Sequence, residues 1–155
     1  MTTKGQIGSR LLLAGGGLSA LASLVHVGII LGGPDWYRFF GAGERMARLA
    51  SRGSVYPAAF TASIAFALAI SSLYALSGAG MIRPLPLLRQ ALVFIAAVYL
   101  FRGMFGIPVV LFLEDPYTNE LRLRMTFMMV TSFICVCLGL CYVVGAGLVQ
   151  PRKRA

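Results

Sequence analysis

The chain has 155 residues, of which 58% are hydrophobic and only 12% are charged. That charged fraction is about half the usual value for a soluble domain, which argues against a protein that folds in water. The net charge of +9 comes from cations spread singly between apolar segments. Such a pattern is a poor surface for reading nucleic acid, so we expect no nucleic-acid partner and take membrane lipids with anionic headgroups as the expected partners.

Four long apolar segments predict an all-α, four-helix transmembrane bundle, with spans at about 11–32, 54–76, 91–113 and 125–149. Each segment is long enough to cross a hydrocarbon core of roughly 30 Å. The first is too long for the apolar part of a signal peptide, so we expect it to be retained. A chain of this length holds one such bundle, and we predict a single integral membrane domain over residues 1–155.

The polar segment between the first two spans predicts one short helix. Residues 44–52 place three arginines on one face and apolar residues on the other, as in an interfacial amphipathic helix. Glycines at 41 and 43 also allow a re-entrant turn at this point. Just before them lie aromatic residues that predict an aromatic belt at headgroup depth, Trp36, Tyr37, Phe39 and Phe40.

Small residues recur at helical spacing within the first two spans. Such stripes allow helices to approach closely in lipid, so they predict the packing faces of these spans. The stripes are Gly15, Ser19 and Ser23 in the first span, and Thr61, Ala65, Ala69 and Ser72 in the second.

The loop charges predict the orientation in the membrane. The two termini and the loop between spans two and three carry seven cations and no acid, and the other two loops carry six cations and all five acids. The cation count is nearly balanced, but the net charge of the first group is far more positive. We therefore expect an inner-membrane protein with both termini in the cytoplasm.

Arg102 lies near the middle of the third span and is the leading candidate functional residue. A charge at the centre of a bilayer costs about 3 kcal/mol or more, so we expect Arg102 to face protein or water rather than lipid. Tyr99 lies on the same helical side. Two interpretations stay open: an arginine bound by carbonyls and hydroxyls of other spans, or a site for an anionic group.

Glu44 and His26 are the other candidate polar groups. No acid lies within any span, so one hypothesis pairs Arg102 with Glu44, delivered by the glycine-flanked loop. The alternative is a surface Glu44 paired with Arg48 one turn later. His26, the only histidine, is either a neutral hydrogen-bonded residue or a group that titrates near neutral pH and passes protons.

Signatures of known chemistry are missing from the sequence. It has no nucleophile elbow, phosphate loop or metal-ligand cluster, and its three cysteines all fall in the last span. A single histidine means that haem would need methionine as second ligand, or a dimer. We therefore lean away from an enzyme and expect no metal site, with the cofactor unknown.

The sequence thus predicts a polar pocket lined by His26, Tyr99 and Arg102, with the Trp36 to Glu44 loop over it. The leading hypothesis is the binding of a lipid-like or quinone-like small molecule, or a role as an accessory membrane subunit. The alternative is a small transporter or proton-coupled carrier that uses His26 and Arg102. A membrane protein partner or a homo-oligomer is compatible with either.

Overall fold

The computed structural model describes residues 3–148, and within that range it is helical with no strands. Four long apolar helices could each cross a membrane by length and composition, in agreement with the four predicted spans. Three short helices lie between them. In chain order the seven are α1 (Thr3–Gly32), α2 (Pro34–Phe39), α3 (Glu44–Ser51), α4 (Tyr56–Gly78), α5 (Leu88–Phe112), α6 (Pro116–Arg122) and α7 (Met125–Leu148).

The observed bounds differ from the predicted spans mainly at the starts of helices. α1 begins at Thr3, well before residue 11, and α5 begins at Leu88 rather than 91. Both extensions are polar turns that continue an apolar helix, so hydropathy alone did not include them. Val149, the last residue of the predicted fourth span, lies outside the described residues.

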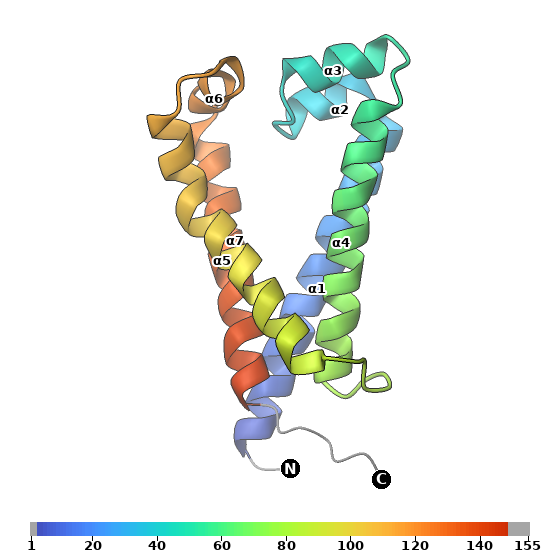
Figure 1. The fold of residues 1–155 in the computed structure, drawn as a ribbon, viewed down its shortest axis with the longest axis vertical. Coiled ribbons are helices and arrows are strands. Elements are labelled where there is room, and N and C mark those ends of the chain that lie inside the picture. Colours follow the sequence, from blue (N-terminus) through green and yellow to red (C-terminus); the bar gives the residue numbers. More distant parts are fainter. Residues whose placement is uncertain (1–2, 149–155) are drawn as a thin grey trace.

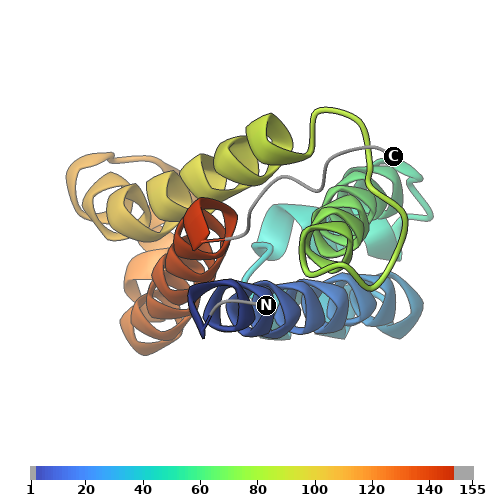
Figure 2. The ribbon, with the colours of Figure 1, turned by 90° about the horizontal axis from the view of Figure 1, so that it is seen from below.

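The long helices form two arms that meet at one end, like a V (Figure 1). One arm pairs α1 with α4, and the other pairs α5 with α7. α1 also packs on α7, and this contact joins the two arms near the N-terminus of α1. The view from below shows α1 and α7 side by side there (Figure 2). We call this the joined end. The opposite end, which carries the short helices, is the capped end.

The joined end is built from small residues that let the backbones approach. A Cβ on Gly15 of α1 would come 3.1 Å from the Tyr142 ring of α7, and a Cβ on Gly145 would come 2.7 Å from Leu12. A Cβ on Gly16 would come 2.9 Å from the Cβ of Ala75 in α4. One buried core therefore contains residues of all four long helices: Leu12, Ala75, Leu92, Ala96, Tyr99, Leu138, Tyr142 and Ala146.

A chain of hydrogen bonds crosses this core. The Ser19 hydroxyl lies 2.9 Å from the hydroxyls of both Tyr99 and Tyr142, and Tyr142 donates to the carbonyl of Ser71 at 3.0 Å. Each hydroxyl has one proton, and a carbonyl only accepts. Tyr142 gives its proton to Ser71, so Ser19 donates to Tyr142 and Tyr99 donates to Ser19. The chain therefore runs in one direction through α5, α1, α7 and α4.

Two short helices cover the capped end of the α1–α4 arm, where the sequence predicted one. The aromatic belt at headgroup depth stays a prediction, and the structure adds that Pro34 starts a helix, α2, that turns Tyr37 inward to 2% exposure. Trp36 and Phe39 stay exposed, and Phe40 is half-buried. α3 has its arginines outside as predicted, yet its apolar side packs on protein, because Ala47 is buried against Ile29 and Tyr37.

The capped end of the α5–α7 arm contains the short helix α6. Its start is fixed by Asp115, whose carboxylate accepts from the amides of Tyr117 and Thr118, while the Thr118 hydroxyl accepts from the Asp115 amide. Arg122 donates to the carbonyls of Val110, Leu111 and Leu113 at the end of α5. These contacts fold α6 back onto its own arm.

Candidate functional site

Arg102 lies on the side of α5 that also carries Tyr99. Tyr99, one turn earlier on this side, contacts Ser19 of α1. The guanidinium lies over Gly106, where any Cβ would overlap it. Arg102 is exposed, and among residues 3–148 its side chain makes no hydrogen bond or ion pair.

Ser132 of α7 lies close to the same glycine. Its Oγ would be 3.1 Å from a Cβ on Gly106, and Ser132 is only 3% exposed. The hydroxyl has no hydrogen-bond partner within the described part of the chain. An unpaired buried hydroxyl costs about 1–3 kcal/mol. The Ser132 hydroxyl and the Arg102 guanidinium, both close to Gly106, are therefore two polar groups without a partner among the described residues.

Tyr117 of α6 lies at the capped end of the α5–α7 arm. Its hydroxyl donates to the carbonyl of Gly41 at 3.2 Å, so it also reaches the other arm. Burial raises the pKa of the Tyr117 hydroxyl, and the positive charge of Arg102 opposes this rise. Along the chain, Arg102 lies between Tyr99 and Tyr117, the two tyrosines of this arm whose hydroxyls bond to the other arm.

His26 is not joined to Arg102 or Tyr99 by any hydrogen bond or ion pair among the described residues. Its Nδ1 lies 2.8 Å from the carbonyl of Ala22 in the same helix, which requires the proton to be on Nδ1. Tyr99 is committed to the bond with Ser19 at the joined end. A shared pocket of His26, Tyr99 and Arg102 stays a prediction.

Glu44 binds Arg38, so the hypothesis of a Glu44–Arg102 ion pair is wrong. Arg38 Nε donates to Glu44 at 2.8 Å, and the same guanidinium binds Asp35 at 2.9 Å. The alternative pairing of Glu44 with Arg48 does not form either. The hydrogen bond from Arg38 lowers the pKa of Glu44, and that of Arg38 is raised in turn. Arg38, six residues before Glu44 and across a tight turn, reaches the Glu44 carboxylate without any movement of the loop toward Arg102.

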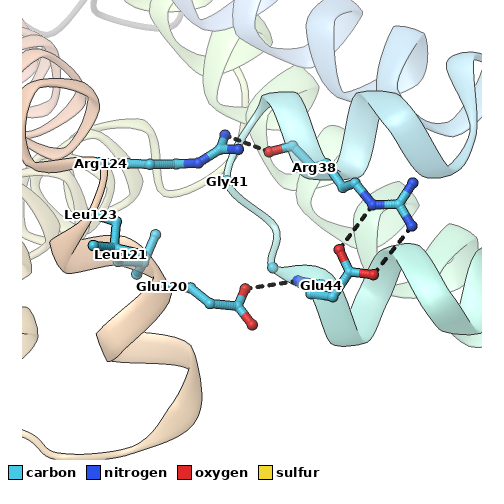
Figure 3. A pocket seen from close by; sticks show the side chains of 8 residues that line it. Arg38, Gly41, Glu44, Glu120, Leu121, Leu123 and Arg124 are labelled. Carbon is cyan, nitrogen blue, oxygen red and sulfur yellow. Dashed lines mark hydrogen bonds and ion pairs between the residues drawn. The ribbon is translucent and has the colours of Figure 1, made fainter.

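A cavity of about 310 Å³ lies at the capped end, where the two arms face each other (Figure 3). Glu44 is the only predicted site residue in its lining. Glu120 and Arg124 approach from the α5–α7 arm and contact the backbone of residues 38–44. The lining consists of Arg38, Gly41, Gly43, Glu44, Glu120, Leu121, Leu123 and Arg124.

Glu120 and Arg124 were missed as candidate residues. The sequence Asp115-Pro116-Tyr117-Thr118 has an N-capping residue, a proline at the first helical position and a threonine at the third. That signal identifies α6 and the helical side on which Glu120 lies. The partner of Glu120 is 76 residues away, and no local pattern indicates it.

Metal chemistry has no support in the described residues. No group of three or more potential ligands comes together there. The three cysteines of α7 are free and half-buried.

Comparison with known proteins adds no assignment. No family model, curated protein or solved structure matches the chain. The site itself must carry the functional argument.

Proposed function

We propose that this is a membrane protein that binds an anionic, lipid-like small molecule between its two arms, with the acidic group on Arg102. The observation that carries the proposal is that the Arg102 guanidinium and the buried Ser132 hydroxyl both lie close to Gly106 and neither has a hydrogen-bond partner among the described residues. A guanidinium presents several N–H groups in a planar fork that suits carboxylate and phosphate oxygens.

The acids of the chain support a ligand as the counter-charge. Glu44 and Asp35 bind Arg38, and Asp115 caps α6. Glu120 accepts from the amide of Glu44. Glu114 is exposed in the loop after α5. None of the five forms an ion pair with Arg102, and an unpaired charge at membrane depth is costly. An anionic ligand would remove that cost.

The apolar surroundings support a ligand with a hydrocarbon tail. Val98, Phe101, Phe105 and Val109, the exposed neighbours of Arg102 on α5, are all large and apolar. In a membrane these side chains would be covered by acyl chains. A molecule with an acidic head and an apolar tail satisfies both Arg102 and its surroundings. A quinone would supply carbonyl acceptors but no charge.

We further propose an inner-membrane location, with the capped end outside and both termini in the cytoplasm. The net charge of the loops supports this orientation. Arg45, Arg48 and Arg52 are exposed around α3 and would lie at headgroup depth on the outer side. Reporter fusions after Gly53 and Asn119 should report the outer side, and fusions after Gly80 and Ala155 the inner side. A C-terminal fusion active outside would reverse the orientation.

Lipid retention by purified variants tests the binding function. We expect wild-type protein in nanodiscs to bind labelled phosphatidylglycerol in preference to labelled phosphatidylcholine. Arg102→Gln should lower the affinity about tenfold or more, because a charge-assisted hydrogen bond contributes roughly 1.5–3 kcal/mol. Arg89→Gln, at an exposed position on the same helix, is the matched control and should bind normally.

Two results would contradict this function. Equal binding by wild type and Arg102→Gln would make Arg102 a structural residue only. A redox-active, uncharged compound in the lipid extract of the wild type, displaced by the same variant, would favour a quinone over an anionic lipid.

A further inference from the structure

The two arms meet again at the capped end, through charged side chains placed at helix ends. Gly43, the residue before α3, has no side chain to cap the helix. Its place is taken from the other arm, because the amide of Glu44 donates to the Glu120 carboxylate at 2.8 Å. A carboxylate at a helix N-terminus satisfies a free amide and complements the helix dipole.

Arg124 makes the opposite contact at the end of α2. Its Nη1 donates to the carbonyl of Phe39 at 3.0 Å and to that of Arg38. The last carbonyls of a helix have no partner within it, so a cation from another element can satisfy them. One acid and one cation of the α5–α7 arm thus bind the two helix ends that flank the turn at residues 40–43.

The turn itself is seated closely against α6 and α7. Gly41 and Gly43 adopt φ angles of +73° and +92°, which favour glycine. A Cβ on Gly43 would come 2.9 Å from the Tyr117 ring, and one on Gly41 would come 3.1 Å from Phe127. The Tyr117 hydroxyl donates to the Gly41 carbonyl. We call Tyr117, Glu120 and Arg124 together with residues 40–43 the clasp.

The clasp differs from a permanent core in two ways. The Arg124 side chain is exposed and Glu120 is half-buried, and the 310 Å³ cavity lies among the clasp residues. A charge-assisted hydrogen bond is worth a factor of about 10 to 150 in an equilibrium constant when it is buried, and less when its side chain is exposed, as that of Arg124 is. Such contacts can be broken and remade without unfolding either arm.

We propose that the clasp is a gate between the arms: its release parts the capped ends of the arms and speeds the exchange of the anionic lipid between the Arg102 site and the membrane. The ligand in this statement rests on the proposed function, whereas the parting of the arms does not. Tyr117 links the two regions, because its hydroxyl contacts the turn of one arm while α6, which carries it, directly follows α5, the helix of Arg102.

Distance measurement between the arms tests the opening. Leu31 at the end of α1 and Phe112 at the end of α5 are 82% and 83% exposed. Each is replaced by cysteine and spin-labelled, after the native cysteines 135, 137 and 141 are changed to alanine. In nanodiscs we expect one main distance for this parent protein. The clasp variant Glu120→Gln/Arg124→Gln should show an added population at longer distance.

The matched control removes one acid and one arginine without touching the clasp. Glu114→Gln/Arg52→Gln changes two exposed side chains that make no side-chain hydrogen bond among the described residues. It should keep the parent distance. In the same samples, labelled phosphatidylglycerol should leave the clasp variant several-fold faster than the parent or the control.

The outcomes separate the gate from the ligand. An unchanged distance in the clasp variant overturns the gate. A longer distance with unchanged lipid exchange means that the arms open without controlling the site, which also overturns the gate but leaves the binding function intact. Absence of lipid binding to the parent protein overturns the binding function and the gate's role in it, while the distance still decides whether the clasp holds the arms together.

Discussion

The joined end and the capped end connect the same two arms by different physics. At the joined end, glycines and serines bring helices into direct contact, and the polar atoms of the hydroxyl chain bond one another inside a buried core. At the capped end, side chains from one arm bind backbone groups of the other beside an open cavity. Close packing stabilises the joined end, whereas hydrogen bonds from charged side chains to helix ends stabilise the contact at the capped end.

The difference assigns different roles to the two ends. Close packing is lost when one atom is added, since interiors are dense and yield little. Polar contacts near the surface exchange readily with water or headgroups, and each contributes only a small net free energy. The joined end therefore suits a fixed pivot, and the capped end suits a contact that opens.

The largest effect should come from overpacking the pivot. Gly145→Leu places a side chain where Leu12 and the Gly8 carbonyl already lie, and such insertions cost about 1–3 kcal/mol or more. The thermal unfolding midpoint in detergent should fall clearly. Gly147→Leu has nothing within 4 Å of its new Cβ and should be neutral or slightly stabilising. Equal midpoints for the two variants would remove the distinction between the ends.

A smaller effect is expected from the hydroxyl chain. Tyr142→Phe removes a hydroxyl that accepts from Ser19 and donates to Ser71, and should cost about 1–3 kcal/mol of stability. Tyr99→Phe removes only one bond and should cost less. Tyr74→Phe loses an exposed bond to Pro86 and serves as the control. A Tyr99 variant less stable than the Tyr142 variant would show that the chain runs differently.

The smallest effect concerns the turn at the capped end, through Arg38 and Glu44. Because the folded pKa of Glu44 is lowered, the stability from this pair is full above the ordinary carboxyl pKa. It is lost as pH falls through the lower folded value. Acid should therefore narrow the difference in unfolding midpoint between wild type and Glu44→Gln. Glu114→Gln, an exposed control, should show no such change. A difference independent of pH would count against the pair.

The long helices and their packing faces were predictable because they depend on local patterns. The four apolar spans follow from hydropathy, and the buried positions of Gly15, Ser19 and Thr61 follow from the spacing of small residues. The exposed arginines of α3 follow from its amphipathic period. These features need only the sequence within one helix.

The partners of polar groups were not predictable in the same way. Arg102 was identified by its cost in a membrane, but Glu44 was assigned to it by elimination, and the nearer Arg38 was overlooked. Glu120 and Arg124 bind backbone groups, which every residue has, so no residue type indicates their targets. Glu120 and Arg124 reach the turn at residues 40–43 only because α6 folds back onto the end of α5.

The hydroxyl chain has a consequence for proton movement. It starts at Tyr99 and ends at the Ser71 carbonyl, and every proton in it has a fixed place. A proton relay needs a final group that can take up a proton and release it again, and a peptide carbonyl does not do so. The chain can therefore hold the four long helices in register but cannot conduct protons between them. Any proton-coupled transport would have to follow another route, away from the pivot.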